Sequence, residues 1–257
     1  MTEVAVHQVW KEYDGVVVLE RVNLDVARHS FVSIVGPSGC GKSTFLRMLL
    51  SQEVPSRGSI RIDGRDLPAE PTEERGVVFQ RYSVFPHLNA LGNVALGLEF
   101  GRSPLVGRLF GARRRAALDE ARAALDSVGL LHAADKYPAQ MSGGMQQRLA
   151  IAQALITRPK VLLLDEPFGA LDPGIRADMH QLMLRLFEHS GMTVFMVTHD
   201  LKEAFHLGTR LVAFDRYRTR PEEIGVYGAT ITLDLPLDRA GARERNEAMA
   251  ELAAKSA

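Results

Sequence analysis

The sequence contains few of the features that mark particular classes of protein. Its 257 residues include one cysteine, and 31 basic residues match 31 acidic ones, so the formal net charge is zero. A single cysteine cannot form an intramolecular disulfide, which makes a reducing compartment the simpler interpretation. Balanced charge argues against a duplex-binding protein whose affinity comes from neutralising phosphates, so no nucleic-acid partner is expected.

Long apolar runs are also missing. Stretches such as residues 161–164 are far shorter than the roughly 20 residues that a membrane-spanning helix needs. The N-terminus lacks a basic segment followed by an apolar one, so we expect no signal peptide. We therefore expect the protein to act on a membrane only through a partner.

Apolar alternation and β-branched runs predict strands in the first third of the chain. These strands are expected at residues 4–9, 16–19, 22–26 and 31–35, each separate from the next. Residues 59–62 lead into Asp63-Gly64, a pair typical of a hairpin turn. The beginning of the chain is therefore predicted to be rich in β-structure.

The middle of the chain changes to a helical pattern. From about residue 86 to residue 157, Ala- and Leu-rich segments predict a mainly helical subdomain. It includes a helix over 116–128 that Gly129 ends. The arginines at 113–115 are interpreted as a solvated helix start, and a surface facing lipid or a partner is the alternative.

Strands and helices then alternate, which predicts an α/β fold with a parallel sheet and crossover helices. The strands are expected at 161–164, 193–197 and 210–214, and the helices at 175–188 and 201–206. A further strand is expected at 229–235. We expect a single domain over residues 1–235 and a helical tail over 236–257.

A glycine-rich segment after the strand at 31–35 fits the phosphate-binding pattern G-x-x-x-x-G-K-[ST]. It consists of Gly36, Pro37, Ser38, Gly39, Cys40, Gly41, Lys42, Ser43 and Thr44. Glycines let successive N–H groups face phosphate oxygens, and the helix predicted over 44–50 directs its positive end to the same anion. Lys42 would reach the β- and γ-phosphates, and Ser43 would bind Mg²⁺. Cys40 is interpreted as a small filler residue.

Two carboxylates follow the apolar strand at 161–164. A carboxylate at the carboxyl end of such a strand can lie beside a phosphate loop, where ligands of open α/β sheets bind. Asp165 is suited to orient Mg²⁺, directly or through water. Glu166 is suited to polarise the attacking water as a general base.

A third motif carries a resemblance to a known family. Ser142, Gly143 and Gly144 lie between the phosphate loop and the carboxylate pair, and the sequence there resembles the signature of ATP-binding subunits of ABC transporters. That signature most often reads Leu-Ser-Gly-Gly-Gln, whereas Met141 and Met145 stand in place of its Leu and Gln. The hydroxyl and the two glycine N–H groups at a helix start are retained.

The other motifs of the family follow in the family's order. Tyr13 matches the aromatic residue that stacks on adenine, and Gln80 matches the glutamine that reaches Mg²⁺ and water. Residues 169–172 resemble the D-loop, with Gly169 where serine is usual. His199 matches the switch histidine near the γ-phosphate. The resemblance covers the chain from about residue 4 to residue 235.

The resemblance implies a P-loop NTPase with a RecA-like core, an antiparallel β subdomain near the N-terminus and an inserted helical subdomain. It also implies that two copies meet head to tail, each ATP lying between the phosphate loop of one copy and residues 142–144 of the other. Closure and reopening of this dimer would drive two membrane permease subunits, through a groove near residues 80–87, at the cytoplasmic face of the inner membrane. A solute-binding protein would be an indirect partner.

Within the family, residues 165–183 and 196–215 look most like the nitrate, sulfonate and taurine import group. Residues 227–232 resemble members associated with urea carboxylase. The short C-terminal region leaves no room for the regulatory domain of sugar-type importers. The alternatives are a soluble non-transport ABC ATPase, an exporter-type ATPase, or a P-loop kinase, which the signature and His199 disfavour.

Overall fold

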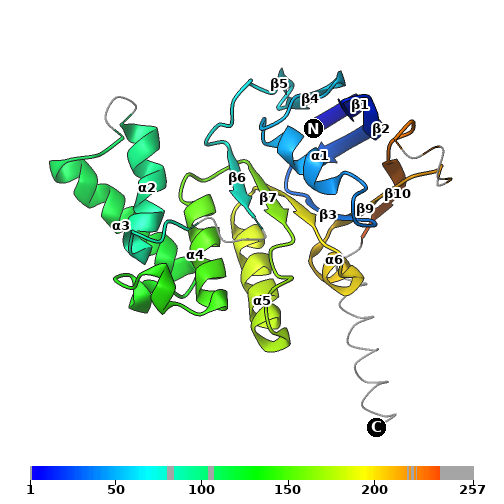
Figure 1. Cartoon of the computed structure of the whole chain (residues 1–257). Helices are drawn as coiled ribbons and strands as arrows, with labels where there is room; N and C mark the ends of the chain where they lie inside the picture. The colour runs from blue at the N-terminus through cyan, green and yellow to red at the C-terminus, as the bar shows by residue number, and fades with distance from the viewer. Residues whose placement is uncertain are drawn as a thin grey trace, which may run out of the picture. The chain divides into compact units, whose positions relative to one another are not determined.

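The computed structural model describes residues 2–79, 84–103, 107–218, 220, 223 and 225–237 (Figure 1). Gln80 and the predicted tail from residue 238 onward lie outside the described residues. The chain forms two units, which are described separately. The first unit comprises Met1–Ala69 and Thr193–Ala257, and the second comprises Glu70–Met192.

An antiparallel sheet forms one layer of the first unit. Its strands, in the spatial order β2-β1-β4-β5, are β1 (Thr2–Tyr13), β2 (Val16–Ala27), β4 (Arg57–Ile62) and β5 (Arg65–Asp66). Asp63 and Gly64 both have positive φ, at 50° and 75°, and they join β4 to β5 in the predicted hairpin turn. Asp14 and Gly15 make the same kind of turn between β1 and β2, with φ of 48° and 81°.

β2 corrects one expectation from the sequence. Residues 16–19 and 22–26 were expected as separate strands, but the structure runs them together as a single strand. Leu19 and Val22 are both buried although they are three residues apart. In a regular strand, side chains an odd number of residues apart point to opposite faces of the sheet. Arg21, at φ 48°, and a shift in the pairing with β1 mark a bulge that returns Val22 to the buried face.

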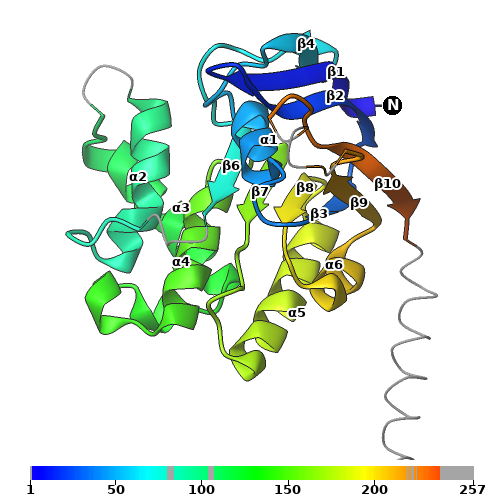
Figure 2. The same ribbon diagram turned by 45° about the vertical axis from the view of Figure 1, so that its right-hand side comes forward.

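A second sheet of the first unit contains parallel strands. Its strands, in the order β10-β9-β3-β8, are β3 (Phe31–Val35), β8 (Thr193–Val197), β9 (Arg210–Asp215) and β10 (Thr230–Pro236). β3 runs parallel to both β8 and β9, two of the strands for which a parallel sheet was predicted, and β10 runs antiparallel to β9. Every residue of β3 and β8 is buried, which explains their continuous apolar sequences. α1 (Lys42–Leu49) lies between the two sheets, as Figure 2 shows, and α6 (Leu201–Leu207) packs on β3.

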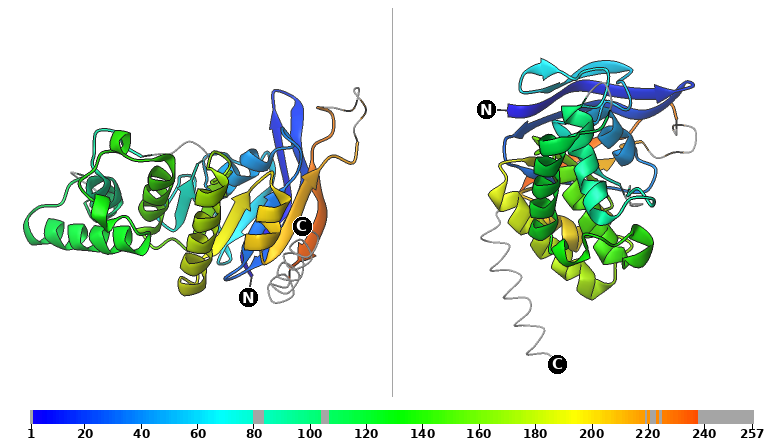
Figure 3. Two further views of the ribbon diagram at one scale, coloured as in Figure 1. Left: turned by 90° about the horizontal axis from the view of Figure 1, so that it is seen from below. Right: turned by 90° about the vertical axis from the view of Figure 1, so that its left-hand side faces the viewer.

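The second unit is largely helical. Its strands β6 (Arg75–Val78) and β7 (Val161–Asp165) pair in parallel. Its helices are α2 (Ala90–Arg102), α3 (Gly111–Ser127), α4 (Gly143–Leu155) and α5 (Pro173–His189), with short 3₁₀ turns at Leu131–Ala133 and Pro138–Gln140. Figure 3 shows α2, α3 and α4 packed side by side. In the described part of the chain, no helix has the length and apolar character needed to cross a membrane.

Gly129 ends α3 as the sequence predicts. Its φ is +73°, its N–H donates to Asp126 O at 2.8 Å, and the N–H of Leu130 donates to Leu125 O at 2.7 Å. These two hydrogen bonds form a Schellman motif, which needs a left-handed residue after the helix. The start of α3, at Gly111, lies five residues before the expected position.

We predict that Gly129→Ala lowers the free energy of unfolding by about 1 kcal/mol, because a Cβ disfavours the left-handed conformation. Urea unfolding followed by circular dichroism measures the change. Gly174→Ala is the matched control, since Gly174 lies in the first turn of α5 and an added Cβ meets nothing within 4 Å. Equal destabilisation by the two variants would contradict the prediction.

Candidate functional site

The predicted phosphate loop connects β3 to α1 in the first unit. Gly36, Gly39 and Gly41 have φ of 147°, 77° and 92°, values that residues with a side chain rarely adopt. A Cβ on Gly36 would collide with the carbonyl oxygen of Phe214, and one on Gly41 would lie 2.7 Å from Leu19 Cδ2. The loop is therefore a narrow backbone cradle whose neighbours leave no room for side chains at positions 36 and 41.

Lys42 lies inside this cradle, only 7% exposed. Its Nζ donates to the carbonyl oxygens of Gly36 and Pro37, both at 2.8 Å, and lies 3.8 Å from Cys40 Sγ. The charge of the lysine is thus held at the first turn of α1, where a phosphate would also meet the positive helix end. Burial raises the pKa of the Cys40 thiol, which supports the interpretation of Cys40 as a filler residue.

Tyr13, at the end of β1, lies in the same unit and is 39% exposed. Its hydroxyl donates to the carboxylate of Glu53, and Lys11 Nζ lies 4.7 Å from the centre of its ring. Burial and then the hydrogen bond to Glu53 raise the pKa of Tyr13, while a hydrogen bond with Thr44 lowers it. Since Thr44 ends the phosphate loop, the structure brings Tyr13 and the loop together.

Glu53 was not predicted from the sequence. Burial alone would raise its pKa, but hydrogen bonds from Tyr13 and Lys11 bring the pKa below its usual value. Lys11 Nζ lies 3.3 Å from Glu53 Oε2, and Arg47 of α1 lies 3.5 Å from Oε1. An ionised Glu53 therefore ties the end of β1 to α1 and orients the Tyr13 ring.

His199 follows β8 and is exposed. The next residue, Asp200, accepts hydrogen bonds from the N–H groups of Lys202 and Glu203 at 2.8 and 3.3 Å and thereby caps α6. Because β3 and β8 are parallel, their carboxyl ends lie at one edge of the sheet. The structure therefore places His199 and the phosphate loop at the same edge.

The predicted carboxylates lie in the second unit. Asp165 is the last residue of β7, and Glu166 follows it with φ of 47°; both are half-buried. A non-glycine residue in the left-handed region is strained and is frequent at functional sites. The carbonyl oxygen of Glu166 accepts a hydrogen bond from Gly169 at 3.4 Å, which folds the chain back after the strand.

The signature motif begins α4. Ser142 is its N-cap and accepts a hydrogen bond from Met145 N at 3.3 Å. Ser142 and Gly143 are exposed, whereas a Cβ on Gly144 would lie 2.6 Å from Ile175 Cγ2 of α5. The exposed hydroxyl and helix start are suited to a second anionic group, and Gly144 is required for the packing of α4 against α5.

The comparison with protein families agrees with these motifs. The sequence pattern of the family described as ABC transporter matches residues 19–169, more than half of the chain. The chain belongs to the ABC transporter family.

Several ABC relatives are importer subunits by name. The chain is 44% identical over 194 residues to the bicarbonate transport ATP-binding protein of Synechococcus elongatus, covering 76% of this chain and 28% of the relative. It is 42% identical to an aliphatic sulfonates import ATP-binding protein of Burkholderia cenocepacia, covering 90% and 65%. It is 38% identical to the nitrate import ATP-binding protein of a Synechocystis strain, covering 90% and 81%. The chain thus spans less than two thirds of the first two relatives.

Solved ABC structures share the fold. The ATP-binding cassette MJ0796, in a dimeric post-hydrolysis state bound to ADP and Pi, has a TM-score of 0.73 and 33% identity. The match covers 91% of this chain and 99% of that one. This likeness confirms the predicted P-loop NTPase fold. The limits predicted for the domain and for its helical subdomain stay predictions.

One of the two departures from the usual ABC signature, Met141, is explained by packing. Met141, in place of leucine, is buried, and methionine fills a leucine-sized space with little cost. In the D-loop, Leu171 is buried and its carbonyl oxygen accepts a hydrogen bond from Arg176 Nη2 at 3.1 Å. Gln80, the remaining predicted ligand, lies outside the described residues.

The described residues contain no ready-made cluster of metal ligands. In the described ranges, no group of three or more His, Cys, Asp or Glu side chains could hold a metal ion. Magnesium commonly takes one or two protein ligands and completes its shell with water and phosphate oxygens. Ser43 in the first unit and Asp165 in the second each offer an oxygen of the kind that magnesium binds, so the residue types suit a metal that arrives with a nucleotide.

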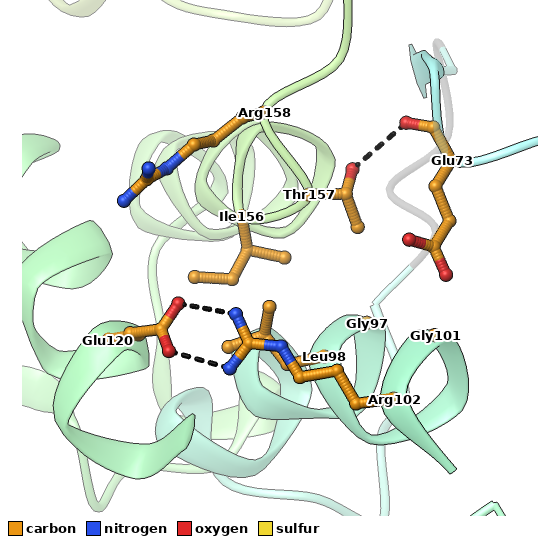
Figure 4. A pocket seen from close by; sticks show the side chains of 9 residues that line it. All are labelled: Glu73, Gly97, Leu98, Gly101, Arg102, Glu120, Ile156, Thr157 and Arg158. Carbon is orange, nitrogen blue, oxygen red and sulfur yellow. Dashed lines mark hydrogen bonds and ion pairs between the residues drawn. The ribbon is translucent and has the colours of Figure 1, made fainter. Parts of the chain in front are cut away.

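A hollow of about 180 Å³ opens between α2, α3 and the end of α4 (Figure 4). Arg102 and Glu120 form a bidentate ion pair in its wall, with N–O distances of 2.6 and 2.8 Å. Across from them, Thr157 Oγ1 donates to Glu73 O at 3.3 Å. None of the described residues that were predicted for the site lines this hollow.

Two neighbouring glutamines of α4 have opposite surroundings. Gln146 Nε2 donates to the carbonyl oxygens of Pro138 and Met141, at 2.9 and 3.3 Å. Gln147 is fully buried, and neither its Nε2 nor its Oε1 has a hydrogen-bond partner among the described residues. An amide buried in this way costs free energy, so Gln147 destabilises the resting helix packing.

We predict that Gln147→Met raises the free energy of unfolding by about 1 kcal/mol, because it removes an unsatisfied amide and keeps a similar volume. Gln146→Met is the control and is expected to lower it by about 1 kcal/mol, since it breaks hydrogen bonds that are made. Chemical unfolding of both variants measures the difference. Equal destabilisation by the two substitutions would show that the Gln147 amide is satisfied.

Proposed function

We propose that this chain is the ATP-binding and ATP-hydrolysing subunit of a small-solute importer. The observation that carries the proposal is the glycine cradle around Lys42, at the sheet edge that also holds His199, in a member of the ABC family. Such a cradle suits the phosphates of a nucleotide. The relatives named for bicarbonate, sulfonate and nitrate uptake support import over export or a soluble role.

We assign a separate role in ATP binding or hydrolysis to each of the predicted site residues. The proposed Mg²⁺ ligands are Ser43, Gln80 and Asp165, and the bound ion would neutralise phosphate charge. Glu166 accepts a proton from the attacking water, and His199 donates a hydrogen bond at the γ-phosphate. Tyr13 offers its ring to the adenine, because Glu53 holds the phenol at one end and leaves part of the ring exposed.

The second half of each site would come from another copy of the chain. The chain contains one phosphate loop and one signature, and Ser142 and Gly143 are exposed at the start of α4. An exposed helix start can bind an anion presented by a partner. The dimeric state of the MJ0796 cassette supports a dimer here, for which we propose the head-to-tail arrangement. ATP would then hold two chains together, and hydrolysis would separate them.

Permease subunits in the inner membrane and a solute-binding protein are the proposed partners, with the chain at the cytoplasmic face. The named substrates of the relatives are small anions, so we propose a solute of the nitrate, sulfonate or taurine type. The likeness of residues 227–232 to urea-carboxylase-associated members makes a urea-related solute the second candidate.

Lys42→Ala is expected to weaken ATP binding by about 10- to 100-fold, the worth of a charge-assisted hydrogen bond to phosphate. Titration with a fluorescent ATP analogue measures the affinity. Lys160→Ala, which removes an exposed lysine paired with Glu74, is the control and should bind as the wild type does. Unchanged affinity in a folded Lys42→Ala variant would remove Lys42 from the phosphate site.

Glu166→Gln is expected to keep ATP binding and to lower kcat by at least about 100-fold, because glutamine cannot accept the proton of the attacking water. The unhydrolysed ATP should trap a dimer, which mass photometry with ATP detects. Glu188→Gln, an exposed carboxylate of α5, is the control for the loss of one charge. Normal turnover by Glu166→Gln would exclude the proposed role.

A further inference from the structure

The connection between α2 and α3 exposes apolar side chains that have no role in the proposed nucleotide site. Among the described residues of the second unit, Phe110 and Phe100 are the most exposed large apolar side chains, at 69% and 59%. Phe100 lies in the last turn of α2, and Phe110 directly precedes α3. Two exposed phenylalanines therefore flank the connection, one at the end of α2 and one directly before α3.

The same segment concentrates positive charge. Residues 99–115 contain five arginines and a single acidic residue, Glu99, in a chain whose net charge is zero. The arginines are Arg102, Arg108, Arg113, Arg114 and Arg115. Arg102 is paired with Glu120 at the hollow of Figure 4. The others are exposed, and Arg113–Arg115 form the first turns of α3.

Several contacts hold these aromatic and basic residues near one another. A Cβ on Gly107 would lie 3.2 Å from Phe100 Cε1, so the backbone at Gly107 is close to the Phe100 ring. The N–H of Gly107 donates to Ser103 O at 2.8 Å, so Gly107 lies beside the residue that follows α2. Arg114 Nε lies 3.5 Å from Glu99 Oε1, so α3 begins beside the end of α2. We name the surface of Phe100, Arg108, Phe110 and Arg113–Arg115 the basic tip.

We propose that the basic tip binds the anionic surface of a lipid bilayer. Phenylalanine side chains enter the headgroup region, and arginines make charge-assisted hydrogen bonds with lipid phosphates. Within the described part of the chain, no carboxylate forms an ion pair with Arg108, Arg113 or Arg115, which leaves their charges for such phosphates.

The composition of the tip favours lipid over a protein partner. Phenylalanine and arginine are common at protein interfaces too, so the choice rests on the excess of positive charge. The tip carries four arginines and no acidic residue, and a continuous anionic lipid surface can neutralise such an excess. Clusters of basic residues bind membranes that contain acidic lipids, and each basic residue near the surface adds to the affinity. The proposal deepens the peripheral membrane location in the proposed function, and it can be tested without a permease.

The experiment measures binding of the full chain to vesicles of phosphatidylcholine with and without phosphatidylglycerol. We expect binding only when phosphatidylglycerol is present, and weaker binding at high salt. The triple variant R113Q/R114Q/R115Q should bind about 100-fold more weakly, from the energy of three arginines at such a surface. The double variant F100S/F110S should also lose binding, at least about tenfold.

Matched controls distinguish vesicle binding by the basic tip from binding by any exposed arginine or aromatic residue. The triple variant R21Q/R65Q/R185Q removes three exposed arginines elsewhere and should bind vesicles as the wild type does. Tyr217→Ser removes an exposed aromatic residue from the first unit and should also bind normally. All tip variants should melt at the wild-type temperature and bind ATP normally, because the tip contains no residue of the nucleotide site.

Three outcomes would overturn the proposal. The first is a wild-type chain that does not distinguish anionic from neutral vesicles. The second is tip variants that bind vesicles as well as the wild type. The third is tip variants that keep vesicle binding but lose assembly with permease subunits, which would assign the tip to a protein partner. Loss of ATP binding by the wild-type chain with vesicle binding intact would refute the proposed function alone.

Discussion

The ammonium group of Lys42 is the feature around which the first unit's functional edge is organised. It is buried, and its charge requires acceptors, which the carbonyl oxygens of Gly36 and Pro37 supply. The backbone can wrap around the lysine only because Gly36 and Gly41 lack side chains. A nucleotide would offer phosphate oxygens to the same ammonium, and charged acceptors bind it more strongly than carbonyl groups do. Binding would thus exchange partners around a charge that is already in place.

Buried parallel strands fix the positions of this loop and of the other motifs, which follow the ends of the strands. β3 and β8 are buried along their whole length, and the phosphate loop and His199 follow their carboxyl ends. In the second unit, Asp165 ends β7, a strand whose first four residues are buried. Loops on such strands can hold strained conformations, as Glu166 does, because the surrounding packing fixes them.

The sequence predicts the features whose chemistry is local. The phosphate loop, the hairpin at Asp63-Gly64 and the Gly129 helix end all depend on residues close together in the chain. Features that depend on distant contacts could not be predicted. The bulge at Arg21 appears in the pairing of β2 with β1, and Glu53 bonds to Tyr13, which is forty residues away in the sequence. The packing of Gly144 against Ile175 likewise gives no local signal.

Net charge is a poor guide to the surfaces of this protein, since opposite charges in separate places cancel. The zero total gave no sign of a charged surface, yet the start of α3 carries three consecutive exposed arginines. Screening limits the reach of each charge to about 10 Å at moderate salt, so a lipid surface senses the basic tip and not the total. Permease subunits would set the position of the chain, and the tip would add a direct contact with the lipid around them.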